Sequence, residues 1–175
     1  MKIIGVLGDI GSGKSFVSKK FNCPVFNADE EVSKLYNKSH SCFKKLKKEF
    51  PKNIKKFPID KKELIKILVK NKSNLKKIIK IIHPLVRIKM NKFLKKNSKK
   101  KLVILDIPLL VENKLYKKNY ILLYIQADTK EIKSRLKKRK NFNKKIYKDL
   151  KSLNMIKFAN FFFLLKGSCS IFKSL

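Results

Sequence analysis

Residues 8–15, which read GDIGSGKS, constrain the fold of this chain more than any other segment. Three of the chain's five glycines fall within these eight positions. The segment fits the pattern GxxxxGKS/T, and it lies between an apolar run that predicts a strand at 2–7 and a helical pattern at 14–21. Such a loop points successive backbone N–H groups at phosphate oxygens, and the following helix presents its positive N-terminal end to them. The segment therefore predicts a site for a nucleoside triphosphate.

The same pattern assigns roles to the side chains of the loop. Lys14 is placed to reach the β- and γ-phosphates, and the Ser15 hydroxyl is placed to bind Mg²⁺. Asp9 gives the loop a likeness to that of small GTPases, but the chain has no NKxD motif and no strand that ends in DxxG. These absences disfavour a GTPase. The residues expected to bind the nucleotide are Gly8, Gly11, Ser12, Gly13, Lys14, Ser15 and Phe16.

Beyond this loop, short apolar runs alternate with helical patterns. Strands are predicted at 2–7, 24–27, 102–105 and 120–125, and helices at 14–21, 28–36 and 129–140. Between 41 and 97 the chain is rich in lysine and helical in period, with breaks expected at Pro51, Pro58 and Pro84. Strands that alternate with helices predict a parallel α/β sheet, in which ligands bind beyond the carboxyl ends of the strands.

Three candidate residues, Gly8, Asp29 and Asp106, lie at the ends of predicted strands. A carboxylate at position 29 faces the nucleotide site and is able to orient and deprotonate an acceptor hydroxyl. The alternative is that Asp29 is the N-cap of the helix that follows. Its position in the sequence does not decide between these two roles.

The chain is strongly basic, with 46 Lys and Arg against 12 Asp and Glu and a net charge of +34. Such a charge attracts polyanions, so nucleic-acid binding is one interpretation. However, only three of the cations are arginines, the lysines are spread along the chain, and no RNP, zinc-knuckle or helix-turn-helix pattern accompanies them. The composition therefore favours solvated, lysine-rich helix faces over a dedicated nucleic-acid surface.

The N-terminus, the apolar segments and the cysteines indicate the cellular location of the protein and the redox state of its thiols. The N-terminal MKIIGVLG is a strand pattern and no signal peptide, and FFFLL at 161–165 is too short to span a bilayer. The three cysteines show no CxxC spacing, which is typical of unpaired thiols in a reducing compartment. We expect a cytoplasmic protein without a membrane partner.

Four segments, in their order and spacing, resemble the dephospho-coenzyme A kinase family. They are GDIGSGKS at 8–15, NADEEV at 27–32, HPLVR at 83–87 and LDIPLLVE at 105–112. The corresponding stretches of the family read roughly GxIGSGKS, DAD, HPxVR and DxPLLFE. The resemblance covers residues 1 to about 140, and other nucleotide kinases share the loop but not the last two motifs.

This resemblance implies the last step of coenzyme A biosynthesis: transfer of the γ-phosphoryl group of ATP to the ribose 3′-hydroxyl of 3′-dephospho-CoA, with Mg²⁺ as the metal. Asp29 is then the general base, Lys14 contacts the phosphates, and Arg139, where a lid begins, stabilises the transferring group. The residues that it implies for the substrate site are Asp29, His83, Arg87, Asp106, Pro108 and Leu109.

Structural roles remain open for several of these positions. A lone helical histidine such as His83 is often part of a core, and apolar residues after a strand, such as Leu109, are often core as well. Arg135 and Lys138 fit a basic helix end that the helix dipole favours, whereas an arginine at 139 in a lysine-rich chain favours a functional role.

The expected architecture is one P-loop kinase domain over 1–175, a three-layer α/β/α fold with a parallel five-stranded sheet. It has a core at 1–40 and 100–140, a helical acceptor-binding insertion at about 41–98, and a lid at about 139–153. In the tail at 154–175 lysine becomes rare, which indicates a worn final strand near 159–162 or a frameshifted coding sequence. We expect a monomer or a weak homo-oligomer.

Two alternative functions remain from the residues alone. One is a kinase of the same fold that phosphorylates a different nucleoside or nucleotide. The other is a basic nucleic-acid-binding protein with a degenerate P-loop, which predicts a steep salt dependence of RNA or DNA binding.

Overall fold

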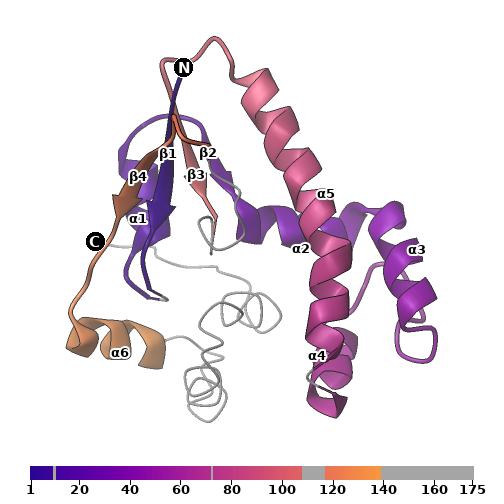
Figure 1. The fold of residues 1–175 in the computed structure, drawn as a ribbon. Coiled ribbons are helices and arrows are strands. Elements are labelled where there is room, and N and C mark those ends of the chain that lie inside the picture. Colours follow the sequence, from indigo (N-terminus) through magenta and orange to yellow (C-terminus); the bar gives the residue numbers. More distant parts are fainter. Residues whose placement is uncertain (10, 72, 108–116, 139–175) are drawn as a thin grey trace.

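The computed structural model describes residues 1–9, 11–71, 73–107 and 117–138 (Figure 1). The elements in chain order are β1 (Lys2–Leu7), α1 (Lys14–Lys20), β2 (Val25–Asn27), α2 (Ala28–Lys38), α3 (His40–Glu49), α4 (Lys61–Lys70), α5 (Asn74–Lys96), β3 (Leu102–Asp106), β4 (Ile121–Tyr124) and α6 (Thr129–Lys137). All four predicted strands and the predicted helices α1, α2 and α6 are present, and each of their ends lies within three residues of the predicted one. A run of helices from α2 to α5 separates β2 from β3 and lies to one side of the sheet (Figure 1).

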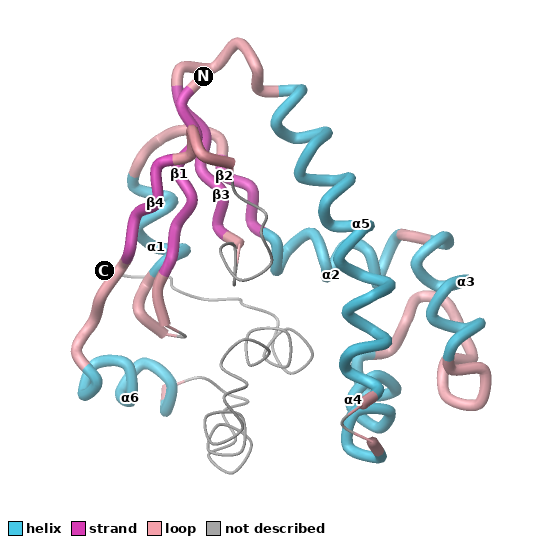
Figure 2. Tube along the Cα trace, in the orientation of Figure 1, coloured by secondary structure: helices cyan, strands magenta, loops and turns pink. Residues whose placement is uncertain are grey.

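The four strands form one parallel sheet in the order β2-β3-β1-β4 (Figure 2). Val6 of β1 and Asn27 of β2 both lie opposite Asp106 of β3, so the carboxyl ends of these three strands meet at one edge. The predicted α/β class is confirmed with four parallel strands. The fifth strand expected near 159–162 lies outside the described residues.

Helices cover both faces of this sheet because successive strand side chains point to opposite sides. On β3, Val103 and Leu105 belong to the hydrophobic cluster that includes α2 and α5, whereas Ile104 is buried outside that cluster. Helix α1 contacts β1, β2 and β3, and α5 packs on the opposite face, where the rings of Phe26 and Phe93 lie 5.5 Å apart. The sheet is therefore the middle layer between α1 and α5.

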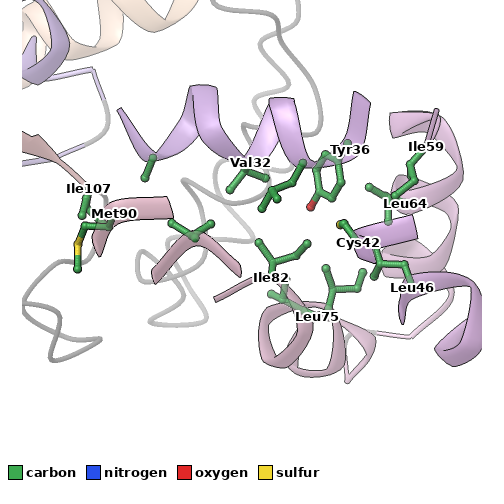
Figure 3. Packing of buried hydrophobic residues seen from close by; sticks show 14 of the residues in the cluster. Val32, Tyr36, Cys42, Leu46, Ile59, Leu64, Leu75, Ile82, Met90 and Ile107 are labelled. Atoms are coloured by element: carbon green, nitrogen blue, oxygen red, sulfur yellow. The ribbon is translucent and has the colours of Figure 1, made fainter. Parts of the chain in front are cut away.

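The main hydrophobic cluster runs from the sheet into the helical segment between β2 and β3 (Figure 3). There α2, α3, α4 and α5 direct apolar side chains toward one another, and the most deeply buried include Tyr36, Leu46, Leu64 and Ile82. The segment is held to the sheet by α5, whose Phe93, near its C-terminal end, packs on Phe26 of β2. This packing fixes where α5 lies relative to the strand ends.

The expected break at Pro84 is wrong, because α5 continues through this residue from Asn74 to Lys96. Its buried residues are Leu75, Ile78, Ile82, Val86 and Met90, which recur every three or four positions along the helix. Burial of each such side chain contributes about 1.5–3 kcal/mol. Together they outweigh the cost of about 3 kcal/mol for a proline in a helix interior, and Pro84 itself is exposed. The breaks expected at Pro51 and Pro58 are confirmed, since both lie between α3 and α4.

The structure also describes the lysines of α5 and two of the three cysteines. The lysines of α5 are exposed. Cys23 and Cys42 are free thiols, and Cys169 lies outside the described residues. In the part of the chain that the structure describes, no helix combines the length and apolarity needed to cross a membrane.

Candidate active site

The loop between β1 and α1 has a backbone that only glycine adopts readily. Gly8, Gly11 and Gly13 have φ angles of 141°, 85° and 99°, all in the positive region. A Cβ at Gly8 would lie 2.3 Å from the carbonyl oxygen of Ile125, which follows β4. These three glycines therefore hold the tight curve that the sequence predicted for a phosphate-binding loop.

The N-terminal end of α1 opens directly onto this loop. Gly13 is the N-cap, and among the described residues no side chain caps the first N–H groups of the helix. Ser12 is 4% exposed, and its hydroxyl has no hydrogen-bond partner among the described residues. A phosphate group would satisfy both kinds of donor, because helix N-termini and hydroxyl groups bind anions readily. The loop thus fits a nucleotide phosphate.

Lys14 and Ser15 begin the helix at the positions that the motif requires. The Nζ atom of Lys14 donates to the carbonyl oxygens of Gly8 and Asp9, at 2.8 and 2.7 Å. The ammonium group therefore lies folded against the loop, on the side of the β1 carboxyl end. Phe16 follows, and 57% of its surface is exposed. Ile10 lies outside the described residues.

Asp106 joins the loop to the ends of β2 and β3. Its Oδ2 atom accepts a hydrogen bond from the Ser15 hydroxyl at 2.6 Å and another from Nδ2 of Asn27 at 3.2 Å. Burial raises the pKa of the Asp106 carboxyl, while the hydrogen bond from Ser15 and the charge of Lys14 oppose that shift. A buried carboxylate is costly unless it has partners or a cation, so this position points to a functional group.

The same pair offers the oxygen ligands that magnesium prefers. The Ser15 hydroxyl and the Asp106 carboxylate are hard ligands, and Mg²⁺ usually takes one or two protein ligands together with phosphates and water. Within the described residues, no group of three His, Cys, Asp or Glu side chains could hold a metal ion by itself. Two protein oxygen ligands suit a Mg²⁺ ion that a bound nucleotide also holds.

Asp29 lies in the first turn of α2, at the same edge of the sheet. The N-cap of α2 is Asn27, whose side chain accepts a hydrogen bond from the Glu30 amide at 3.0 Å. The alternative in which Asp29 caps this helix is therefore wrong. Asp29 is half-buried and stands two residues after Asn27, which binds Asp106. Asn27 and Asp106 thus link the end of β2, just before Asp29, to Ser15 at the start of α1; an acceptor-facing role for the Asp29 carboxylate stays a prediction.

His83 and Arg87 lie one turn apart on α5, the helix that packs against α2. His83 is half-buried and Arg87 is exposed. Burial lowers the pKa of His83, and the charge of Arg87 lowers it further. The structure brings the helix that carries both residues against the helix that carries Asp29; contact of these side chains with a substrate stays a prediction.

The remaining predicted site residues cannot be placed. Pro108, Leu109 and Arg139 lie outside the described residues. The segments at 139–153 and 154–175 lie there too.

Two residues of the site were missed by the sequence analysis. Asn27 both caps α2 and binds Asp106, and its signal was the Asn-x-x-Glu spacing at the start of a helix. Arg135 donates to the carbonyl oxygens of Gly11 and Ser12, although a basic helix end was favoured for it. The rarity of arginine in this chain, used to argue for Arg139, applied equally to Arg135.

Three features define a P-loop nucleotide-binding protein. The parallel sheet has this loop after its first strand, a lysine and a serine begin the next helix, and an aspartate lies at the end of β3. Comparison with known proteins narrows the class. A family model described as dephospho-CoA kinase matches residues 2–156. The chain therefore belongs to the dephospho-CoA kinase family, and it is an ATP-using kinase of coenzyme A biosynthesis with a small-molecule substrate.

Individual relatives agree with this assignment. Dephospho-CoA kinase from Bartonella henselae is 38% identical over 150 residues, which are 83% of this chain and 76% of the relative. Dephospho-CoA kinase from Aquifex aeolicus is 32% identical over 170 residues, 92% of this chain and 87% of the relative. Among solved structures, TT1252 from Thermus thermophilus matches with a TM-score of 0.68 and 25% identity, over 90% of this chain and 82% of that one. The resemblance seen in the sequence is thereby confirmed.

Proposed function

We propose that this chain transfers the γ-phosphoryl group of ATP to the ribose 3′-hydroxyl of 3′-dephospho-CoA, giving coenzyme A and ADP. The observation that carries the proposal is the hydrogen-bonded set of Ser15, Asp106 and Asn27. It ties the phosphate loop to the strand end from which Asp29 projects. Phosphate binding and an acceptor-facing carboxylate thus occupy one edge of the sheet.

The phosphate loop binds and orients the nucleotide in this proposal. Its backbone N–H groups and the N-terminal end of α1 bind the phosphate oxygens, and the ammonium group of Lys14 offsets charge on the β- and γ-phosphates. The Ser15 hydroxyl and the Asp106 carboxylate would hold Mg²⁺. When bound there, Mg²⁺ supplies charge neutralisation to the β- and γ-phosphate oxygens.

Asp29 prepares the acceptor. Its carboxylate orients the 3′-hydroxyl and accepts its proton as the 3′-oxygen forms a bond to the γ-phosphorus. The bond from that phosphorus to the β–γ bridging oxygen breaks, and the electron pair leaves with ADP. Arg139 stabilises the charge of the group in transfer.

The acceptor site takes the residues that the sequence analysis assigned to it. His83, Arg87, Pro108 and Leu109 bind and orient dephospho-CoA. Asp106, assigned to that site as well, acts with Ser15 on the nucleotide side, since its Oδ2 atom accepts from the Ser15 hydroxyl. A cytoplasmic location, a monomeric or weakly oligomeric state and the absence of a specific nucleic-acid partner stay predictions.

Replacement of the proposed base tests the mechanism. We expect Asp29→Asn to lower kcat for coenzyme A formation by about 10²–10⁴-fold, with the binding of ATP little changed. Glu30→Gln is the matched control, because it makes the same chemical change at the neighbouring, exposed position of α2. Equal rates for Asp29→Asn and the wild type would remove Asp29 from the reaction, whereas equal losses in both variants would indicate a general charge effect.

A further inference from the structure

Helix α6 packs on the phosphate loop, a contact that the proposed mechanism does not use. Ile132 and Leu136 are buried, and a Cβ at Gly11 would lie 3.4 Å from a side-chain carbon of each. On the same helix, Nη1 of Arg135 donates to the carbonyl oxygens of Gly11 at 3.3 Å and of Ser12 at 3.2 Å. The helix thus holds the loop through apolar contacts and through a guanidinium group.

The two carbonyl groups that Arg135 binds belong to consecutive peptide planes. Because a peptide unit is planar, the direction of the Gly11 carbonyl fixes that of the Ser12 N–H, and the Ser12 carbonyl fixes the Gly13 N–H. The Ser12 N–H closes the loop onto the carbonyl oxygen of Asp9 at 3.1 Å. Contact with both carbonyls therefore sets the orientation of the backbone in the centre of the loop.

The position of the guanidinium group is itself fixed from its own helix. Nη2 of Arg135 lies 2.9 Å from Oε2 of Glu131, one turn earlier on α6. One nitrogen thus pairs with the carboxylate while the other reaches the loop, a division that suits the planar fork of arginine better than the single ammonium of lysine. In a chain with only three arginines among 46 basic residues, this geometry gives the residue type a physical reason.

We propose that Arg135 is a positioning residue for nucleotide binding. By holding the peptide planes on either side of Ser12, it keeps the N–H groups of the phosphate loop in the orientation that binds phosphate oxygens. The inference rests on the proposed function only in taking ATP as the ligand of the loop. It differs from the role of a basic helix end, which stabilises α6 and leaves affinity for ATP unchanged.

Equilibrium binding of ATP to the full-length chain, measured by titration calorimetry, tests this role. We expect Arg135→Ala to raise the Kd for ATP about tenfold, the loss typical of hydrogen bonds to a charged group. Arg135→Lys keeps the charge without the fork, so we expect partial rescue, with a Kd about threefold above that of the wild type. The control is Lys133→Ala, which removes the same charge from an exposed position of α6 and should change the Kd less than twofold, about the effect of one screened surface charge.

Steady-state kinetics supply a second readout. The KM for ATP should rise in Arg135→Ala, while kcat and the KM for dephospho-CoA stay within about twofold of the wild type. The reason is that the substitution weakens the binding of ATP equally in the ground state and in the transition state. A folded Arg135→Ala chain with an unchanged Kd for ATP overturns the proposal, as does an equal weakening in Lys133→Ala. If Arg135→Ala does not fold, Arg135→Lys decides: a weaker Kd supports the proposal and an unchanged one overturns it.

The two readouts separate this inference from the proposed function. A wild-type chain that binds ATP but forms no coenzyme A would refute the proposed reaction. The effect of Arg135 on the Kd for ATP would still stand or fall by the binding measurement alone.

Discussion

Substitution of Gly8 by alanine tests the geometry of the phosphate loop most sharply. The new Cβ would lie 2.3 Å from the backbone oxygen of Ile125, well inside the 3.0 Å that real Cβ atoms respect, and 2.9 Å from Oγ of Ser12. Neither the loop nor the segment after β4 can yield through a side-chain rotation alone. Together with the positive φ of 141°, this contact should cost about 2–4 kcal/mol of unfolding free energy.

Gly13→Ala is the matched comparison. Gly13 also has a positive φ, 99°, but among the described residues its added Cβ would meet Nη1 of Arg135 alone, at 3.5 Å. Strain without a collision predicts a loss of about 1–2 kcal/mol. For a chain of this length 1 kcal/mol corresponds to a change in Tm of about 2–4 °C, so Gly8→Ala should melt roughly 5–15 °C below the wild type and Gly13→Ala roughly 2–8 °C below it.

Differential scanning calorimetry on the wild type and both variants gives the melting temperatures, and titration with ATP gives the affinities. We expect Gly8→Ala to be the less stable of the two and to lose ATP affinity, because the loop must move to relieve the contact. A Gly8→Ala chain as stable as Gly13→Ala, with the affinity of the wild type for ATP, would refute the reasoning from loop geometry.

Three further predictions concern stability and activity together. Asp106→Asn should lower kcat by about 10²-fold or more by loss of the carboxylate on the nucleotide side. Burial raises the pKa of Asp106, so the unfolding free energy of the wild type falls as the pH rises through that pKa. Measured by urea unfolding between pH 4 and pH 8, the unfolding free energy of Asp106→Asn should therefore rise relative to that of the wild type. A constant difference between the two chains would contradict this. Burial and the charge of Arg87 lower the pKa of His83 below 6.5, so as the pH falls the unfolded chain binds the proton before the folded chain does. The wild type should therefore lose stability as the pH falls through 6.5. His83→Gln should remove that component from the pH profile of Tm. Pro84→Ala should raise the unfolding free energy by about 1–3 kcal/mol, since α5 already runs through this exposed position; a lower Tm would show that the proline is needed there.

The parts of the fold that the sequence predicted are those with strong local signals. The strand at 2–7 is a short apolar run that ends in a glycine, and the loop after it has a spacing dictated by phosphate chemistry, so both were confirmed. The helix that begins at 28 was also confirmed, and its acidic first turn follows directly after a strand. In each case the local residues and the tertiary structure favour the same conformation.

The prediction of a break at Pro84 was wrong because tertiary packing outweighs the local effect of the proline. A proline removes one helical hydrogen bond, and this effect can be read from a single letter. The opposing effect is the burial of five apolar side chains along α5, which contacts α2, α3 and α4, and it depends on neighbours that include residues far away in the sequence. Periodicity on both sides of Pro84 was the signal that favoured one continuous helix.

The site shows the same division between local and long-range information. Lys14, Ser15, Asp29 and Asp106 were predicted as site residues from motif and strand-end position, and the sheet brings the ends of β1, β2 and β3, from which these residues follow, to one edge. Arg135 was assigned to a basic helix end, because no local pattern shows that α6 crosses the phosphate loop. Its contacts with Gly11 and Ser12 span more than 120 residues and exist only in the folded chain.

Identification of the acceptor and its phosphorylated atom tests the central claim most directly. The measurement is ADP formation by the full chain with ATP and Mg²⁺, with dephospho-CoA compared against other nucleosides and nucleotides, and with the product examined by phosphorus NMR. The account predicts ADP formation that depends on dephospho-CoA and a product that carries its new phosphate on the ribose 3′-oxygen. ADP formation that is indifferent to dephospho-CoA, or faster phosphorylation of another acceptor, would contradict it.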